Sequence, residues 1–178
     1  MRESGVTEPD VMGERLDVVN ERDEVVGQIS RADPALRWRD VRVVNAFLRN
    51  QHGELWIPRR NPSKILYPNA LDVSVGGAVQ SGETYEQAFR RETREEVVLN
   101  LDDVEWYELA AFSPYQTGLS SFMRVYEIRS DQTPAYNPQD FSGGEWLTPG
   151  QVLARIAAGE AAKGDLAELV RHCYGGKE

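Results

Sequence analysis

The sequence predicts an α/β domain in which a mixed β-sheet packs between helices. Segments rich in β-branched and aromatic residues dominate the first half of the chain. Thr84 and Thr148 each have a glutamine three residues later, which is the pattern of a capping box at the start of a helix. Helical periodicity follows each of them. Further strand-like segments lie between these helices, so helices alternate with strands only in the second half of the chain. A chain of 178 residues suits one domain with a sizeable core.

The first half of the chain supplies most of the expected strands. Residues 1–13 are polar and acidic, so we expect a flexible N-terminal tail before a single domain at 14–178. Strands are expected at residues 15–20, 25–30, 41–49, 54–60 and 71–79. The sequence NQHG between the third and fourth is a hairpin signal. Residues 32–38 are expected to form a loop or a short helical turn, and 61–69 a loop punctuated by two prolines.

The second half alternates helices and strands. Thr84 is expected to start the first helix, and strands are expected at 104–112 and 121–129. Residues 131–144 are predicted to form a long loop, followed by a short strand at 145–147. Thr148 caps the next expected helix, and a last helix is expected to run from Asp165 to about Tyr174.

The helix after Thr84 carries an unusual set of acids. Glu92, Glu95 and Glu96 are spaced i, i+3 and i+4, so they fall within about 100° of one helical face. The same face carries Tyr85, Ala88, Phe89 and Leu99. Val97 is expected to point elsewhere. The acids therefore extend the apolar, buried stripe. Carboxylates on such a face resist desolvation, and a divalent cation such as Mg²⁺ or Mn²⁺ is the simplest remedy.

The loop and helix resemble the signature of the Nudix hydrolase family. The matching residues are Gly77, Glu83, Arg91, Glu92, Glu95, Glu96 and Leu99. Thr93 departs where an apolar residue is usual, and Val98 departs where glycine is usual. Glycine at that position commonly forms a left-handed helix cap, so Asn100 is an alternative cap that gives a longer helix.

The resemblance implies an α/β/α sandwich over roughly residues 41–160, and it implies roles for the matching residues. The implied metal ligands are the carbonyl of Gly77 and the carboxylates of Glu92, Glu95 and Glu96. Arg91 is implied to orient the glutamates through a charge-assisted hydrogen bond, and Glu83 to brace the loop. The alternative is an ordinary solvated, charge-rich helix face.

The flanking sequence resembles the Nudix subgroup akin to isopentenyl-diphosphate isomerase. Arg60 and Lys64 match the Arg and Lys that hold the substrate diphosphate there, although a solvated basic turn is the alternative. Arg59 alternates to the opposite strand face. The isomerase chemistry itself is disfavoured, because Gly76 stands at its cysteine position and Ala78 at its histidine position. Hydrolysis is therefore favoured over isomerisation.

The expected reaction is metal-assisted attack of water on a diphosphate linkage, in nucleoside di- or triphosphates by resemblance. Asp140 is the loop candidate for a general base and Glu145 the second choice, although either is equally an ordinary surface acid. Tyr115 is the candidate for stacking on a base. Phe112 and Phe122 are more typical of core positions. A non-catalytic nucleotide sensor on the same fold is the main alternative.

Composition limits the partners. A net charge of −9 argues against binding to duplex nucleic acid or an anionic membrane, but allows a small phosphorylated substrate. The single cysteine, Cys173, permits no intrachain disulfide and fits a reducing cytoplasm. No apolar run is long enough to predict a membrane span.

Overall fold

The computed structural model describes residues 13–175. Its strands are β1 (Arg15–Val19), β2 (Val25–Ser30), β3 (Arg42–Arg49), β4 (Leu55–Arg60), β5 (Val75–Ala78), β6 (Trp106–Phe112), β7 (Phe122–Arg129) and β8 (Phe141–Leu147). Its helices are α1 (Tyr85–Val97), α2 (Pro149–Ala157) and α3 (Leu166–Tyr174), with 3₁₀ turns η2 (Trp38–Asp40) and η3 (Leu101–Asp103). The predicted tail at 1–13 lies outside the described residues, except for Gly13.

The main sheet has six strands and is mixed. Its order is β6-β7-β3-β4-β8, and β5 pairs with β3 off this path. The central strand β3 runs parallel to β7 and antiparallel to β4 and β5. The pairing of Arg49 with Leu55 closes the β3–β4 hairpin around NQHG, as the sequence predicted. Strands β1 and β2 form a separate two-stranded ribbon.

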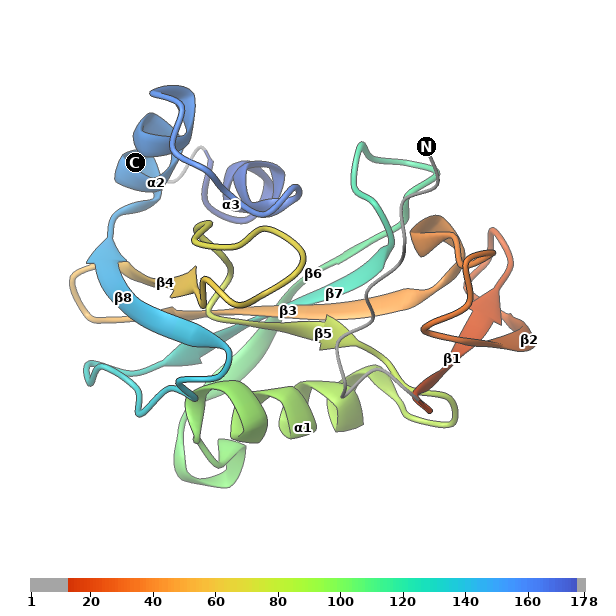
Figure 1. The fold of residues 1–178 in the computed structure, drawn as a ribbon. Helices are drawn as coiled ribbons and strands as arrows, with labels where there is room; N and C mark the ends of the chain where they lie inside the picture. Colours follow the sequence, from red (N-terminus) through yellow and green to blue (C-terminus); the bar gives the residue numbers. More distant parts are fainter. Residues whose placement is uncertain (1–12, 176–178) are drawn as a thin grey trace.

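Helices cover both faces of this sheet (Figure 1), with α1 on one side and α2 and α3 on the other. Side chains alternate along β3, so Val44 and Ala46 join a core cluster with Ala88 and Phe89 of α1. Phe47 joins the opposite cluster, which includes residues of α2 and α3. The predicted α/β sandwich with a mixed sheet is therefore confirmed.

Helix α1 begins at a capping box and ends at a residue in the left-handed conformation. The Thr84 hydroxyl accepts a hydrogen bond from the Gln87 N–H, and the Gln87 side chain accepts one from the Thr84 N–H, which completes the predicted capping box. The helix ends at Val97, and Val98 itself adopts the left-handed conformation at φ 56°. The longer helix with Asn100 as cap was therefore wrong, since Asn100 instead caps η3.

Two side chains of α1 correct the sequence analysis. Val97, which was expected to point away from the core, is fully buried, because the apolar stripe widens at the end of the helix. Thr93 is also fully buried, and its hydroxyl has no hydrogen-bond partner among the described residues. An apolar side chain would lose nothing at that position.

Strand β8 starts earlier than predicted. Residues 141–144 were expected to be loop because they include two glycines, yet they pair with β4. Gly144 is required there, because a Cβ would overlap the Trp56 ring packed against it. The expected strand at 71–79 is regular only over Val75–Ala78.

No helix among the described residues is long and apolar enough to cross a membrane.

Candidate active site

The close approach of β5 to α1 forms one wall of the site. The Glu92 carboxylate lies against Gly77, where a Cβ would overlap it. Gly76 is similarly confined, since a Cβ there would lie 2.9 Å from Asn45 Oδ1 and 3.7 Å from Lys163 Nζ. Glycine at position 77 lets the backbone of β5 approach the acidic face of α1, and glycine at position 76 leaves room for Asn45. The glycine pair and the acids are thus one structural unit.

Arg91 connects the acids of this unit. Its Nε and Nη2 donate to the two Glu83 oxygens at 2.8 and 3.0 Å, and its Nη1 donates to Glu92 at 2.6 Å. Nη2 also reaches the Ala78 carbonyl at 3.1 Å, while Glu83 accepts the Gln80 N–H at 2.9 Å. The guanidinium therefore ties the β5–α1 loop to the helix, a geometry in keeping with the roles implied for Arg91 and Glu83.

The pKa values of Glu92 and Glu96 are shifted from their ordinary values. Burial raises the pKa of Glu92 to about 7, against the opposing effect of Arg91. Glu96 is partly exposed as a residue, yet its carboxyl is enclosed by protein and accepts a hydrogen bond from the Gly76 N–H at 2.9 Å. That enclosure, with the nearby charges of Glu92 and Asp72, raises the pKa of Glu96 well above its usual value.

Glu95 does not join this pair. Its side chain is 57% exposed, and its contact with Arg91 Nη1 is 3.5 Å long. Within residues 13–175, no group of three or more acidic, histidine or cysteine side chains is arranged to hold a metal ion. Arg91 donates to both Glu83 and Glu92, whereas the Glu95 carboxylate points largely into solvent. The expectation that all three acids share one buried face holds only for Glu92 and the carboxyl of Glu96.

The donors that are present nevertheless suit a hard divalent cation. Two enclosed carboxyls, Glu92 and Glu96, adjoin the backbone of Gly76 and Gly77, and oxygen ligands of this type are those that Mg²⁺ and Mn²⁺ prefer. A cation at this place would offset the desolvation that raises both pKa values. Glu95 would have to turn inward from solvent to add a third carboxylate.

Three basic side chains pair with two further acids, Asp72 and Asp140. Arg60 Nη1 donates to buried Asp72 at 2.8 Å, and Lys64 Nζ lies 2.9 Å from Asp140 Oδ1. Lys163 Nζ lies 3.5 Å from the other Asp72 oxygen. Arg60 and Lys64, the basic side chains predicted to bind substrate, are thus ion-paired to acids in this structure.

Asp72 and Lys163 were missed by the sequence analysis. Asp72 is a charged residue inside the apolar run LDVSV, and that was an available signal. Lys163 carried no such signal, because it reaches the site through tertiary structure. Leu71 donates to the Ala161 carbonyl and accepts from the Lys163 N–H, which brings the α2–α3 connection beside the start of the β5 segment.

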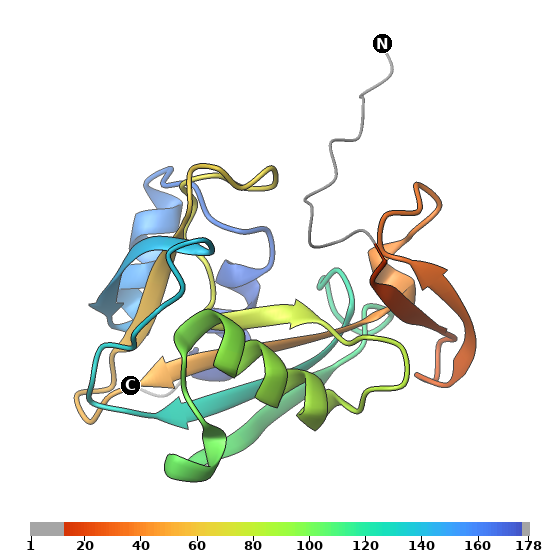
Figure 2. The same ribbon diagram turned by 60° about the horizontal axis from the view of Figure 1, so that its bottom comes forward.

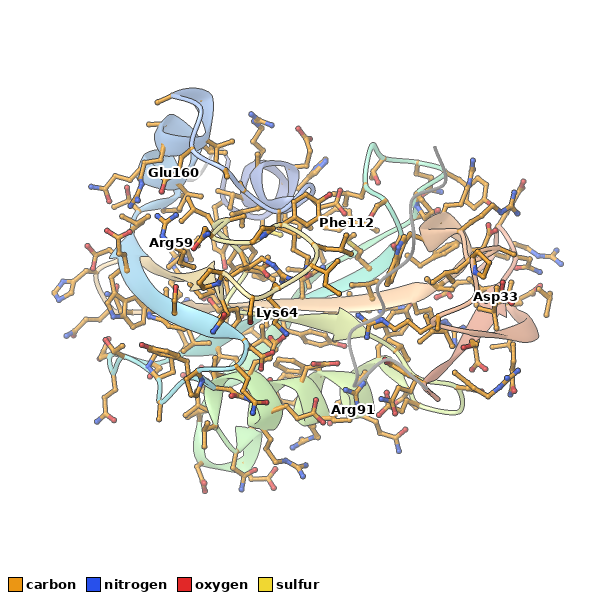
Figure 3. The ribbon with its side chains drawn as sticks, viewed as in Figure 1. Asp33, Arg59, Lys64, Arg91, Phe112 and Glu160 are labelled. Atoms are coloured by element: carbon orange, nitrogen blue, oxygen red, sulfur yellow. The ribbon has the colours of Figure 1, made fainter. Side chains whose placement is uncertain are left out.

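The remaining predicted residues are dispersed. Glu145 pairs with Arg155 on α2 at 2.8 Å. The Tyr115 ring packs against Phe122 and lies under the Arg39 guanidinium. Arg59 pairs with Glu160, and Figure 3 shows these two side chains pointing toward one another, apart from Lys64 and Arg91.

Comparisons with known proteins identify the family. The NUDIX domain model matches residues 39–169. The chain belongs to the Nudix family. It is 76% identical over 164 residues to a Nudix hydrolase of Deinococcus radiodurans, covering 92% of this chain and 96% of that one. It is 46% identical to an uncharacterized Nudix hydrolase of Nostoc, covering 90% of this chain and 96% of that one.

Solved structures agree with this assignment. A crystal structure from Deinococcus radiodurans has 77% identity and a TM-score of 0.89, covering 90% of this Nudix chain and 99% of that chain. The Escherichia coli dihydroneopterin triphosphate pyrophosphohydrolase has 16% identity and a TM-score of 0.51, covering 74% of this chain and 92% of that one. The second match shows the fold alone. The subgroup resembling isopentenyl-diphosphate isomerase stays a prediction.

Proposed function

We propose that this protein is a divalent-cation-dependent hydrolase that cleaves a phosphoanhydride linkage in nucleoside di- or triphosphates. The observation that carries the proposal is the enclosed acid pair of Glu92 and Glu96, set against Gly76 and Gly77. Family membership supports hydrolysis of small phosphorylated substrates. The nucleotide and the cation, Mg²⁺ or Mn²⁺, are the finer parts of the proposal.

Glu92 and Glu96, with the Gly77 carbonyl and an inward-turned Glu95, would hold the cation. The chemistry that such a cation supplies is neutralisation of phosphate oxygens and acidification of water. Arg60 and Lys64 bind the diphosphate, the first as a planar fork of donors and the second as a point charge. Their present partners, Asp72 and Asp140, show that both side chains can be oriented by oxygen anions at this place.

The reaction also needs an acceptor for the proton of the attacking water. The water oxygen forms a bond to phosphorus, the bridging P–O bond breaks, and the proton moves to a carboxylate. Asp140 becomes available when Lys64 turns toward a phosphate. Glu92 is the alternative acceptor, because burial raises its pKa to about 7.

A substrate panel tests the proposal directly. Phosphate and diphosphate release is measured from nucleoside mono-, di- and triphosphates, dinucleotides and nucleotide sugars, with Mg²⁺, with Mn²⁺ and with a chelator. We expect turnover of di- or triphosphates that the chelator abolishes. Turnover that persists in chelator, or the absence of turnover across the whole panel, would refute the proposed function.

One observation favours a second candidate, a nucleotide-binding sensor without turnover. Glu95 is exposed, and the described residues contain no preformed cage of three acids. A sensor predicts thermal stabilisation by a nucleotide with no product formed. Isomerisation of isopentenyl diphosphate is a further alternative, and formation of its allylic isomer would revive it.

A further inference from the structure

A cavity of about 310 Å³ lies beside the proposed active site. We call it the side cavity. Arg31, Asp33 and Trp38 line one side of it, and Arg60, Ile65 and Leu66 line the other. The first group belongs to the segment after β2, and the second to the end of β4 and the loop that follows it. Figure 2 shows the segment after β2 beside the start of β3, and the loop after β4 above β5.

Charged side chains link the side cavity to the acid pair of Glu92 and Glu96. Arg60 lines the cavity and also donates to Asp72, whose charge acts on the Glu96 carboxyl. Arg31 lies at the other margin, and its charge is among the influences that oppose the burial-driven rise in the pKa of Glu92. A ligand that fills the cavity would therefore have an anionic end within reach of both arginines and the acids.

The walls of the side cavity suit a flat ring. The Trp38 indole is 39% exposed, and the Arg31 guanidinium lies 5.8 Å from its ring centroid. Ile65 and Leu66 are exposed apolar side chains on the opposite wall. Asp33 accepts the Ala35 N–H through Oδ1 and contributes a carboxylate, a hydrogen-bond acceptor, to the cavity lining. An aromatic face with a polar edge is the chemistry of a nucleobase.

The position of Trp38 is fixed by its surroundings. Trp38 begins the η2 turn, and its carbonyl accepts the Val41 N–H. Arg31, which lies over the indole, is itself ion-paired to Glu14 at 2.7 Å. The backbone at Trp38 and the Arg31 guanidinium are therefore held before a ligand arrives, which lowers the entropy cost of binding.

We propose that the side cavity binds the base of a nucleoside di- or triphosphate, stacked on Trp38, while its phosphates extend past Arg60 to the acid pair. This inference rests on the proposed function and adds the location of the organic half of the substrate. The cavity volume lies near the lower end of the range of about 300–1,000 Å³ for small-molecule sites, which suits one nucleoside rather than a dinucleotide. Tyr115, the aromatic residue expected from sequence, is not among the lining residues.

Binding is tested separately from turnover. ADP, GDP, CDP and UDP are titrated with Mg²⁺ by calorimetry into the Glu96→Gln protein, and into the same protein carrying Trp38→Ala, Trp38→Phe or Tyr115→Ala. We expect Trp38→Ala to weaken nucleotide binding about tenfold and Trp38→Phe to restore most of it. Trp38 is a surface residue, so these variants are expected to fold. Ribose 5-diphosphate is the control ligand, and its affinity should not depend on residue 38.

The outcomes separate the two proposals. Equal weakening for ribose 5-diphosphate, no weakening by Trp38→Ala, or weakening by Tyr115→Ala alone would overturn the side cavity as the base site. Those results would leave turnover of nucleotides by the wild-type protein untouched. Conversely, base-dependent binding at Trp38 by a wild-type protein without turnover would uphold the cavity and refute the proposed hydrolase.

Discussion

Two of the buried carboxyls in this molecule, those of Glu127 and Glu96, have different surroundings. Glu127 in β7 is fully buried, accepts hydrogen bonds from the hydroxyls of Tyr107 and Tyr174, and pairs with Arg129 at 2.9 Å and Arg49 at 3.7 Å. The Glu96 carboxyl accepts one backbone N–H and faces two other acids. Donors thus saturate one buried acid and leave the other short of positive charge.

This contrast separates a fully compensated buried acid from an under-compensated one. A buried charge is tolerated when donors and cations compensate it, as they do at Glu127. The fold supplies no comparable compensation at Glu96, so its carboxyl is suited to an external cation. The four predictions that follow test the contrast, from the largest expected effect to the smallest.

Replacing Glu96 by glutamine should lower kcat about a thousandfold, because a metal-held charge supplies several kcal/mol and about 1.4 kcal/mol corresponds to tenfold in rate. The measurement is Mg²⁺-dependent phosphate release at saturating nucleotide. Glu86→Gln is the matched control, since Glu86 lies on the same helix and pairs with Arg90. Full activity of the Glu96 variant would remove this carboxylate from the proposed metal site.

The metal-free protein should lose stability as the pH rises. The pKa of Glu92 is about 7 in the folded state, above its ordinary value of 4.5, and the pKa of Glu96 is raised as well. The folded protein therefore keeps protons that the unfolded chain releases. Stability that is fully present below about pH 4.5 is lost as the pH rises through about 7, by at most about 3 kcal/mol for Glu92.

Urea unfolding in chelator between pH 5 and pH 8 measures this loss, and Mg²⁺ should reverse more of it at pH 8 than at pH 5. Glu96→Gln should flatten the profile. A stability that rises over this range, in the absence of metal, would contradict the assignment of these acids as under-compensated.

Replacing Glu127 by glutamine should have the opposite signature. We expect a loss of about 2 kcal/mol in the free energy of unfolding, because the two arginines lose their shared charge partner. Activity per folded molecule should be unchanged. Urea unfolding measures the change in the free energy of unfolding, and kinetics of the wild-type and variant proteins measure the activity per folded molecule. A stable but inactive variant would show that the contrast between the two acids is false.

The smallest expected effect is at Val98, which ends the helix that carries Glu96. A β-branched residue at φ 56° is strained, so Val98→Gly should stabilise the protein by about 1 kcal/mol. Val98→Ala is the control, since it retains the Cβ. Thermal melts give the effect. Unchanged kcat in both variants is expected, and a fall in kcat with Val98→Gly would mean that the strained cap positions the acids.

The sequence predicted well wherever local chemistry decides structure. The capping boxes at Thr84 and Thr148, the hairpin around NQHG and the Nudix fold are all confirmed. Local sequence patterns were misleading where tertiary contact overrides local preference. Val98 adopts a conformation that glycine prefers. Gly143 and Gly144 lie in a strand that pairs with β4, and Trp56 packs against Gly144.

The candidate site was predicted in part for the same reason. The acids and Arg91 come from one continuous segment, so their spacing carried the information. The exposure of Glu95 was not predictable, because helical spacing gives the face on which each acid lies but not the direction that its long side chain takes. Lys163 was missed because a backbone pairing with Leu71, remote in sequence, places it. The assigned catalytic and binding roles stay predictions.

The side cavity straddles the boundary of the family match. Arg31 and Trp38 precede residue 39, where that match begins, whereas the acid helix lies well inside it. The proposed base site therefore draws on both sides of this boundary, because Arg60, Ile65 and Leu66 lie inside the match. Grafting residues 31–38 from a relative onto this scaffold would be a compact route to altered substrate preference, with the reaction machinery left in place.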